Sequence, residues 1–417
     1  MADAGPYFGA VRPYPGERKG RRARGEGATA WYLHGRPADA GERSERSWGL
    51  ALKILRGKGS GGVVGSIFVN HEIQVVTVGR PIHVVLAVPF ALIAHRGASG
   101  HRPEHTLASY ELAARQGADF IEPDLVITGD GVLVARHEPE ISTTTDVAER
   151  PEFASRMTTR DLDGTATTGW FAEDFTLAEL ETLRARERIP RLRPQNTAYD
   201  GRFEIPTFQA VLDLRERLSD ELGREIGVYP ETKHPTYFRR LGLPLEEPLV
   251  AVLRRNGLDR EGAPVFVQSF EAGSLRRLGG ELKVPLVQLF GAKGARPYDL
   301  VACGDPRTYA DLATPAGLRA IAAYADGAGP RKDHIVPRDA AGNSLPATRF
   351  VDDAHAAGLL VHPHTFRAEN AFLPLELRSS DDPAEHGDLA AEVRQFLALG
   401  VDGLFTDNPG TARKAGR

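Results

Sequence analysis

Eight short apolar segments alternate with amphipathic helices from about residue 88 to the end of the chain. Such alternation predicts parallel strands with helical crossovers, and eight of them over about 320 residues fit a (β/α)₈ TIM barrel with inserted loops. An open doubly wound sheet is the alternative, but the glycine-rich dinucleotide fingerprint is absent. A short ninth strand over 334–337 is also possible. The eight predicted strands are 92–96, 120–126, 132–137, 226–233, 265–270, 286–290, 359–365 and 403–407.

Local signals mark where several of the helices begin and end. Thr106 is a predicted N-cap of a helix with Leu107, Tyr110 and Ala114 facing inward, and Gly117 would end it. Similar signals predict five more helices, over 206–222, 248–258, 315–325, 348–358 and 388–400.

Two connections, 138–204 and 291–314, are longer than a simple loop. We expect them to form caps over one mouth of the barrel. Aromatic and basic residues of the first, among them Trp170 and Arg193, would suit a substrate rim, although ordinary packing would explain at least half of them.

The head of the chain differs in composition from its body. Residues 1–60 are rich in Gly, Arg, Pro and Ser and hold 12 Lys and Arg against 6 Asp and Glu. We therefore expect residues 1–85 to form a disordered or loosely ordered extension, and 86–417 to form the barrel domain. The acidic body argues against nucleic acid as the main partner, because phosphate-backbone binding needs clustered Lys and Arg.

The remaining totals exclude some classes of protein. One cysteine, Cys303, excludes an intramolecular disulfide and a cysteine-rich zinc site. No apolar stretch reaches the roughly 18–20 residues of a membrane span, so no stable membrane insertion is expected. No ordinary signal peptide follows Met1, which favours a cytoplasmic location if that residue is the true start.

Carboxylates gather at the ends of two predicted strands. Glu122 and Asp124 are two positions apart and so point to the same side, and Glu231 and Lys233 repeat that spacing on another strand. Two carboxylates aimed together repel each other unless a cation or a proton lies between them. Each acidic pair alone is about as consistent with a solvated strand end as with a metal site. Three carboxylates beside two histidines favour a hard oxygen site for Ca²⁺ or Mg²⁺.

Two histidines end different predicted strands. His95 follows the apolar run 91–94, and His137 ends the segment 132–137. Either alone is more often a hydrogen-bonded surface histidine, but a pair beside a metal suits a general acid and a general base. Arg96 and Lys233 add fixed positive charge for the oxygens of a phosphate. Together these residues predict a phosphodiester hydrolysis site.

The same residues lie in a series of ordered motifs, and with them the chain resembles the glycerophosphodiester phosphodiesterase family over about residues 90–412. The resemblance implies a TIM barrel and the hydrolysis of glycerophosphodiesters to an alcohol and sn-glycerol 3-phosphate. The motifs are His95–Thr106, Glu122-Pro123-Asp124, His137, Glu231-Thr232-Lys233, Gln268-Ser269-Phe270, His362–Arg367 and Phe405–Pro409.

The resemblance also implies a role for individual residues. It makes His95 and His137 the acid/base pair and gives one divalent cation, Ca²⁺ in preference to Mg²⁺, to the carboxylates. Arg96 and Lys233 would hold the phosphate, with Phe270 and Arg367 as further substrate-binding residues. The long loop after His137 is similar to that of larger, often exported, bacterial members. The metal ligands implied in this way are Glu122, Asp124 and Glu231.

Two positions depart from the family pattern, and two other functions stay open. His105 stands where many members have Asn, and Glu138 where many have Asp. The first alternative is a phospholipase-D-like or sphingomyelinase-like lipid phosphodiesterase on the same barrel. The second is a catalytically silent barrel that binds phosphodiesters. The sequence fixes neither the head group of a small-molecule substrate nor the oligomeric state.

Overall fold

The computed structural model describes residues 28–33, 50–55, 63–69, 72–78 and 90–416. The chain divides into two compact units, residues 1–89 and 90–417. In the first unit four strands pair in an antiparallel sheet in chain order. The rest of that unit, for which a disordered or loosely ordered chain is predicted, lies outside the described residues. The strands are β1 (Ala28–Leu33), β2 (Leu50–Leu55), β3 (Val63–Val69) and β4 (Glu72–Val78).

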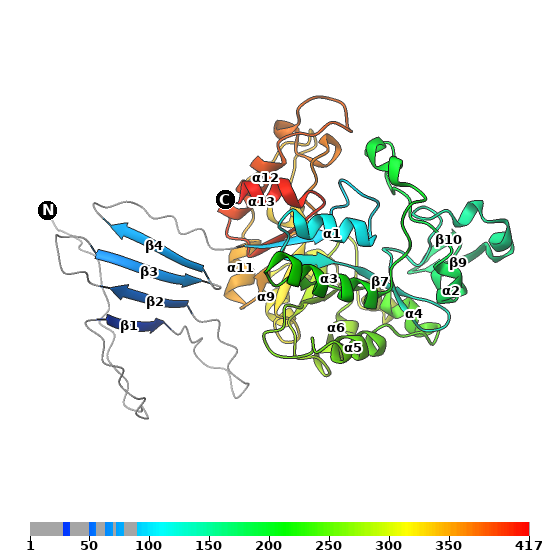
Figure 1. Cartoon of the computed structure of the whole chain (residues 1–417), viewed down its shortest axis with the longest axis horizontal. Helices are drawn as coiled ribbons and strands as arrows, with labels where there is room; N and C mark the ends of the chain where they lie inside the picture. Colours follow the sequence, from blue (N-terminus) through cyan, green and yellow to red (C-terminus); the bar gives the residue numbers. More distant parts are fainter. Residues whose placement is uncertain (1–27, 34–49, 56–62, 70–71, 79–89, 417) are drawn as a thin grey trace. The chain divides into compact units, whose positions relative to one another are not determined.

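The second unit is an eight-position parallel barrel, which confirms the predicted fold class (Figure 1). The ring closes where β17 pairs in parallel with β5, and where the Asp402 amide donates to the Val361 carbonyl at 3.0 Å beside β16. In order around the ring the strands are β5 (Ala91–His95), β6 (Phe120–Glu122) with β7 (Asp124–Ile127), β11 (Gly227–Val228) with β12 (Glu231–Thr232), β13 (Val267–Ser269), β14 (Leu286–Phe290), β15 (Gly327–Pro330), β16 (Leu360–Val361) and β17 (Gly403–Thr406).

Two of the eight positions are interrupted by proline. Pro123 separates β6 from β7, and Pro230 lies between β11 and β12. Proline has no N–H and cannot donate to the ladder, so the pairing resumes one residue later. The interruptions stand beside the carboxylates of the predicted metal site.

One predicted barrel strand is wrong, and one barrel strand was missed. Residues 132–137 contain β8 (Leu133–Ala135), which pairs antiparallel with β7 and forms a hairpin outside the ring. The eighth position is β15, whose sequence Gly-Ala-Gly-Pro has almost no β propensity. Its small residues are needed, because a Cβ on Gly329 would lie 2.6 Å from the Leu289 side chain. The possible ninth strand is instead helix α10 (Lys332–Ile335).

Helices surround the strands (Figure 1), and all six predicted ones are present with shifted ends. The Thr106 hydroxyl accepts from the Ser109 amide at 3.1 Å, as the predicted N-cap requires. Leu107, predicted to face inward, is 38% exposed, whereas Tyr110 is buried. The outer helices are α1 (Leu107–Arg115), α3 (Phe208–Leu222), α4 (Pro235–Arg240), α5 (Glu246–Arg255), α6 (Ala272–Gly279), α9 (Pro315–Ile321), α11 (Phe350–Ala356), α12 (Leu389–Ala398) and α13 (Pro409–Ala415). Within the described ranges no helix has the length and apolar character to cross a membrane.

The two long connections carry short elements of their own. The first holds the hairpin of β9 (Thr158–Leu162) and β10 (Thr165–Gly169) and the turn α2 (Leu177–Leu180). The second holds α7 (Tyr298–Ala302) and α8 (Tyr309–Leu312). Single 3₁₀ turns complete the 138–204 and 365–378 segments: Val147–Glu149, Pro151–Arg156, Ala172–Asp174, Pro194–Tyr199, Asn370–Phe372 and Leu375–Leu377.

The inside of the barrel is filled with side chains. Ile93, Tyr229, Val287 and Phe405 form a buried cluster, and the Tyr229 ring stacks on Phe266 with centroids 5.0 Å apart. A larger apolar cluster lies between the strands and the helices. Because the interior is packed, ligands bind such a barrel at its mouth, where the loops leave the carboxyl ends of the strands.

Candidate active site

A cavity of about 670 Å³ opens at the carboxyl ends of the barrel strands. All nine site residues predicted from the sequence meet there. Asp124 and Lys233 lie beside the cavity and contact residues that line it. The other seven predicted residues line it directly: His95, Arg96, Glu122, His137, Glu231, Phe270 and Arg367.

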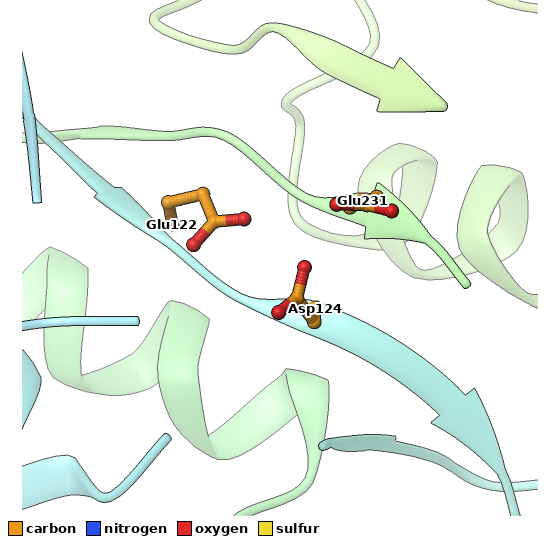
Figure 2. A group of neighbouring side chains, drawn as sticks. All are labelled: Glu122, Asp124 and Glu231. Carbon is orange, nitrogen blue, oxygen red and sulfur yellow. The ribbon is translucent and has the colours of Figure 1, made fainter. Parts of the chain in front are cut away.

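The acidic triad, which we define as Glu122, Asp124 and Glu231, is the centre of this site. One carboxylate oxygen from each residue lies within 4.8 Å of the others. Parallel register places Glu231 directly beside Asp124, so neighbouring strands bring the three groups together (Figure 2). All three are at most 5% exposed.

The electrostatics of the triad fit a bound cation. Burial and the negative charge of its neighbours raise the pKa of Glu122 well above its usual range, and burial raises the pKa of Glu231 to about 8. A divalent cation would relieve this repulsion and hold all three groups as carboxylates. Gln268 donates to Glu122 Oε1 at 2.9 Å, and its own buried Oε1 has no hydrogen-bond partner among the described residues. A surplus of hard oxygen atoms is the donor set that Ca²⁺ and Mg²⁺ prefer.

His105 and Lys233 hold two of the carboxylates. His105, one of the two departures from the family pattern, is fully buried and joins Asp124 Oδ2 at 2.9 Å to the Tyr110 hydroxyl at 2.8 Å. Lys233 Nζ lies 2.9 Å from Glu231 Oε1. Although burial favours the neutral acid, the charges of Lys233 and other neighbours keep the pKa of Asp124 well below its usual range.

Arg96 connects the loop after β5 to the triad. Its backbone adopts φ +59°, and its amide donates to Glu122 Oε2 at 2.8 Å. The guanidinium lies 2.9 Å from Glu104 Oε2 through Nη1 and 3.3 Å from Asp124 Oδ2 through Nε. A buried guanidinium fixed in this way presents permanent positive charge to the cavity.

His95 is oriented by a carboxylate at the opposite end of the sequence. Its Nδ1 lies 2.6 Å from Asp407 Oδ1, and Arg193 and Arg367 hold Asp407 Oδ2 at 2.5 and 2.8 Å. Burial and the charge of Arg96 lower the pKa of His95 to about 4, so the ring is neutral at pH 7. The Nδ1 proton then bonds to Asp407, and the lone pair of Nε2 is available for proton transfer.

His137 is held in the same manner by its neighbour in sequence. Its Nδ1 hydrogen-bonds with Glu138 Oε1, and Arg188 Nη2 lies 2.7 Å from Glu138 Oε2. Burial and the positive charges of Arg96 and Lys233 lower the pKa of His137 below its ordinary value. Glu138, the second departure from the family pattern, therefore orients a candidate acid/base group.

The 138–204 insertion contacts residues of the site through two arginines, and none of its residues lines the cavity. Arg193, one of the residues that would suit a substrate rim, has a side chain that is 4% exposed and lies between Glu369 and Asp407. Arg188 bonds to Glu104 and Glu138. Sequence reasoning assigned no role to Asp407, which ends the predicted strand 403–407 but has no acidic residue two positions away.

Known proteins resemble this chain over nearly the whole described barrel. Glycerophosphodiester phosphodiesterase GDPD6 of Arabidopsis thaliana is 37% identical over 331 residues, which cover 76% of this chain and 84% of the plant protein. The glycerophosphodiester phosphodiesterase of Haemophilus influenzae is 30% identical over 343 residues, covering 77% and 88%. A crystal structure of a Silicibacter pomeroyi protein shares the fold, with a TM-score of 0.54, 22% identity, and coverage of 79% of this chain and 94% of that one.

Fold, site and relatives together define the class as a TIM-barrel phosphoric diester hydrolase. The profile of the Glycerophosphoryl diester phosphodiesterase family matches residues 95–411. The chain belongs to this family.

Proposed function

We propose that the protein hydrolyses a glycerophosphodiester to an alcohol and sn-glycerol 3-phosphate, with one divalent cation at the acidic triad. The observation that carries the proposal is the meeting, in one cavity, of three clustered carboxylates and two carboxylate-oriented histidines. Membership of the family supports the same reaction.

Glu122, Asp124 and Glu231 would hold the cation, with Ca²⁺ favoured over Mg²⁺. When bound, such a cation polarises a phosphoryl oxygen and offsets the charge that develops in the transition state. Its absence would leave three buried carboxylates competing for protons, which makes cation binding and folding mutually dependent.

His95 and His137 are the proposed general acid and general base. Both rings carry their proton on Nδ1 toward a carboxylate, so each exposes Nε2 to the reaction. One would accept the proton of the attacking hydroxyl, and the other, once protonated, would donate to the leaving alcohol. The attacking group is water or the glycerol 2-hydroxyl of the substrate.

Arg96 and Lys233 are the proposed phosphate-binding side chains. Both line or adjoin the cavity, are at most 7% exposed, and flank the triad from different strands. Buried donors of fixed geometry lose little solvation when the phosphate binds, so they stabilise its developing charge strongly. Phe270 and Arg367 line the same cavity and complete the proposed substrate-binding set.

One experiment tests this function directly. The purified chain is incubated with several glycerophosphodiesters while released glycerol 3-phosphate is measured. It is then stripped with EDTA and restored separately with Ca²⁺ and with Mg²⁺. We expect release that stops on stripping and returns best with Ca²⁺. Release from none of the diesters, or full activity after stripping, contradicts the proposal.

A lipid phosphodiesterase remains the other enzymatic candidate, and the walls of the cavity argue against it. A lysophospholipid needs an apolar groove for its acyl chain. Here charged side chains line the far end of the cavity as well as the triad end, among them Arg331, Arg338 and Glu392. Comparing release of choline from glycerophosphocholine and from lysophosphatidylcholine separates the two functions.

A further inference from the structure

The cavity continues past the acidic triad to a second group of charged side chains, which we call the headgroup end. It comes from the segment after β15, from the loop after β16 and from α12. A glycerol 3-phosphate moiety over the triad leaves this part of the cavity to the other alcohol of the diester. The charged residues of the headgroup end are Arg331, Lys332, Asp333, Arg338, Arg367 and Glu392.

Positive charge is in excess at the headgroup end: with Arg367 set aside because it pairs with Asp407, three cationic side chains stand against two carboxylates. One carboxylate is shared: Lys332 Nζ lies 2.7 Å from both oxygens of Glu392, and Arg338 Nη2 lies 3.3 Å from Oε1. Arg331 meets Asp333 at 3.2 Å and is half exposed. The electrostatic potential at this end therefore favours an anion.

The aromatic rings of the cavity are already paired with cations of the chain. Lys233 Nζ lies 5.4 Å from the centre of the Phe270 ring, and the Arg367 guanidinium lies 4.6 Å from that of Phe372. The two other phenylalanines that line the cavity, Phe396 and Phe405, are at most 2% exposed. An ammonium headgroup is bound best by an accessible aromatic face; two of these four rings already have a cation of the chain against one face, and the other two are buried.

We propose that the headgroup end selects diesters whose leaving alcohol carries an anionic group, a carboxylate or a phosphate, over those that carry an ammonium. The inference rests on the proposed function, since it concerns the leaving group of that reaction. An arginine fork binds either anion with two parallel hydrogen bonds, whereas an ammonium would meet like charge. Arg331 and Arg338 are the side chains of this end best placed to change partners, because both are partly exposed.

Two matched pairs of substrates test the selectivity. Glycerophosphoserine differs from glycerophosphoethanolamine by one carboxylate, and glycerophosphoinositol 4-phosphate differs from glycerophosphoinositol by one phosphate. We expect kcat/KM for glycerol 3-phosphate release to be roughly tenfold higher for the more anionic member, as one added charge-assisted contact would give. The pair that shows the preference identifies the anion.

Charge-neutralising variants assign the preference to this end of the cavity. In R331Q/R338Q, and more weakly in R331Q alone, the ratio within each pair should fall toward one. R319Q changes an exposed arginine of α9 outside the cavity and should keep the wild-type ratio. Thermal unfolding checks that each variant is folded. If the double variant is not folded, R331Q alone is used for the comparison.

The outcomes separate the inference from the function on which it rests. Equal rates within both pairs, or a ratio that R331Q/R338Q leaves unchanged, overturn the inference while leaving diester hydrolysis intact. Release from no diester at all overturns the proposed function instead.

Discussion

Two groups of buried charges share the mouth of this barrel, and they differ in balance. The acidic triad places three carboxylates together, and burial and mutual repulsion raise the pKa of two of them. The Asp407 network, which we define as Arg193, Glu369, Asp407 and Arg367, alternates positive and negative groups at 2.5–2.8 Å. The first group could hold a cation, whereas the positive and negative groups of the second pair with one another.

The difference separates a ligand site from a structural support. Clustered like charges are unfavourable in a folded chain unless a ligand of opposite charge binds them. Alternating buried pairs gain little net energy by forming, but removing one member leaves an uncompensated charge. Changes in the triad should therefore affect ligand binding, and changes in the Asp407 network should affect stability. His95 lies beside both groups, so changing it should affect both ligand binding and stability.

The largest effect is expected at the histidines that stand beside these two groups. H95A and H137A should each lower kcat by roughly 10²–10⁴-fold, because a positioned acid or base is lost. Steady-state kinetics on a glycerophosphodiester measures the loss. H355Q, at an exposed histidine of α11 paired with Asp402, is the control and should turn over normally. Near-wild-type turnover of H95A or H137A would remove the histidines from the mechanism.

The next largest effect tests the Asp407 network as a support. R193A leaves Glu369 and Asp407 buried without their shared cation, which should lower the free energy of unfolding by about 3–5 kcal/mol. Urea denaturation measures this loss of unfolding free energy. R186A, which breaks an exposed pair with Glu149 in the same insertion, should change it little. If the two variants lose equal stability, the Asp407 network contributes no more to folding stability than an exposed ion pair does.

Removing the cation tests the triad as a ligand site. A Ca²⁺ concentration about 100 times Kd should raise the free energy of unfolding by about 2.7 kcal/mol, and EDTA should reverse the gain. E231Q removes a ligand and a repelling charge, so its stability should depend little on Ca²⁺, while E216Q on an exposed face of α3 should behave as wild type. Calorimetry with and without Ca²⁺ gives the Ca²⁺-dependent gain in stability of each protein. A Ca²⁺ gain that survives in E231Q would place the cation elsewhere.

The smallest effect concerns a buried carboxyl outside the cavity. Burial raises the pKa of Glu173 to about 7, despite a hydrogen bond from Tyr237 and Arg160 Nη1 at 3.0 Å. Between about pH 4.5 and 7 the folded state therefore binds the proton that the unfolded state releases, so stability falls as pH rises. The fall should be on the order of 1–3 kcal/mol.

The variant E173Q cannot release that proton and should lack this part of the pH dependence. Unfolding free energies at several pH values between 4.5 and 8 would compare the two proteins. Parallel pH profiles for wild type and E173Q would show that Glu173 titrates normally in the folded state.

The sequence predicts the residues of the site better than it predicts which segments form the barrel strands. The i, i+2 spacing of Glu122 with Asp124 places both on one side of a strand whatever the strand pairs with, so this pair could be read from local geometry. The place of Glu231 beside the pair depends on which strands are neighbours. Which apolar segment joins the ring depends on packing between distant segments. The apolar β8 looks like a barrel strand yet forms a hairpin, while glycine-rich β15 fits in the ring because its residues are small.

The sequence by itself determined the alternation that makes a barrel, the carboxylates and histidines at the strand ends, and the family. Only the tertiary structure decided how these groups are held. His95 and Asp407 are 312 positions apart and meet because the last strand pairs with the first. Arg193 reaches the same carboxylate from an insertion. Side-chain direction along a strand is a local property, whereas closure of a ring is set by contacts that no local pattern records.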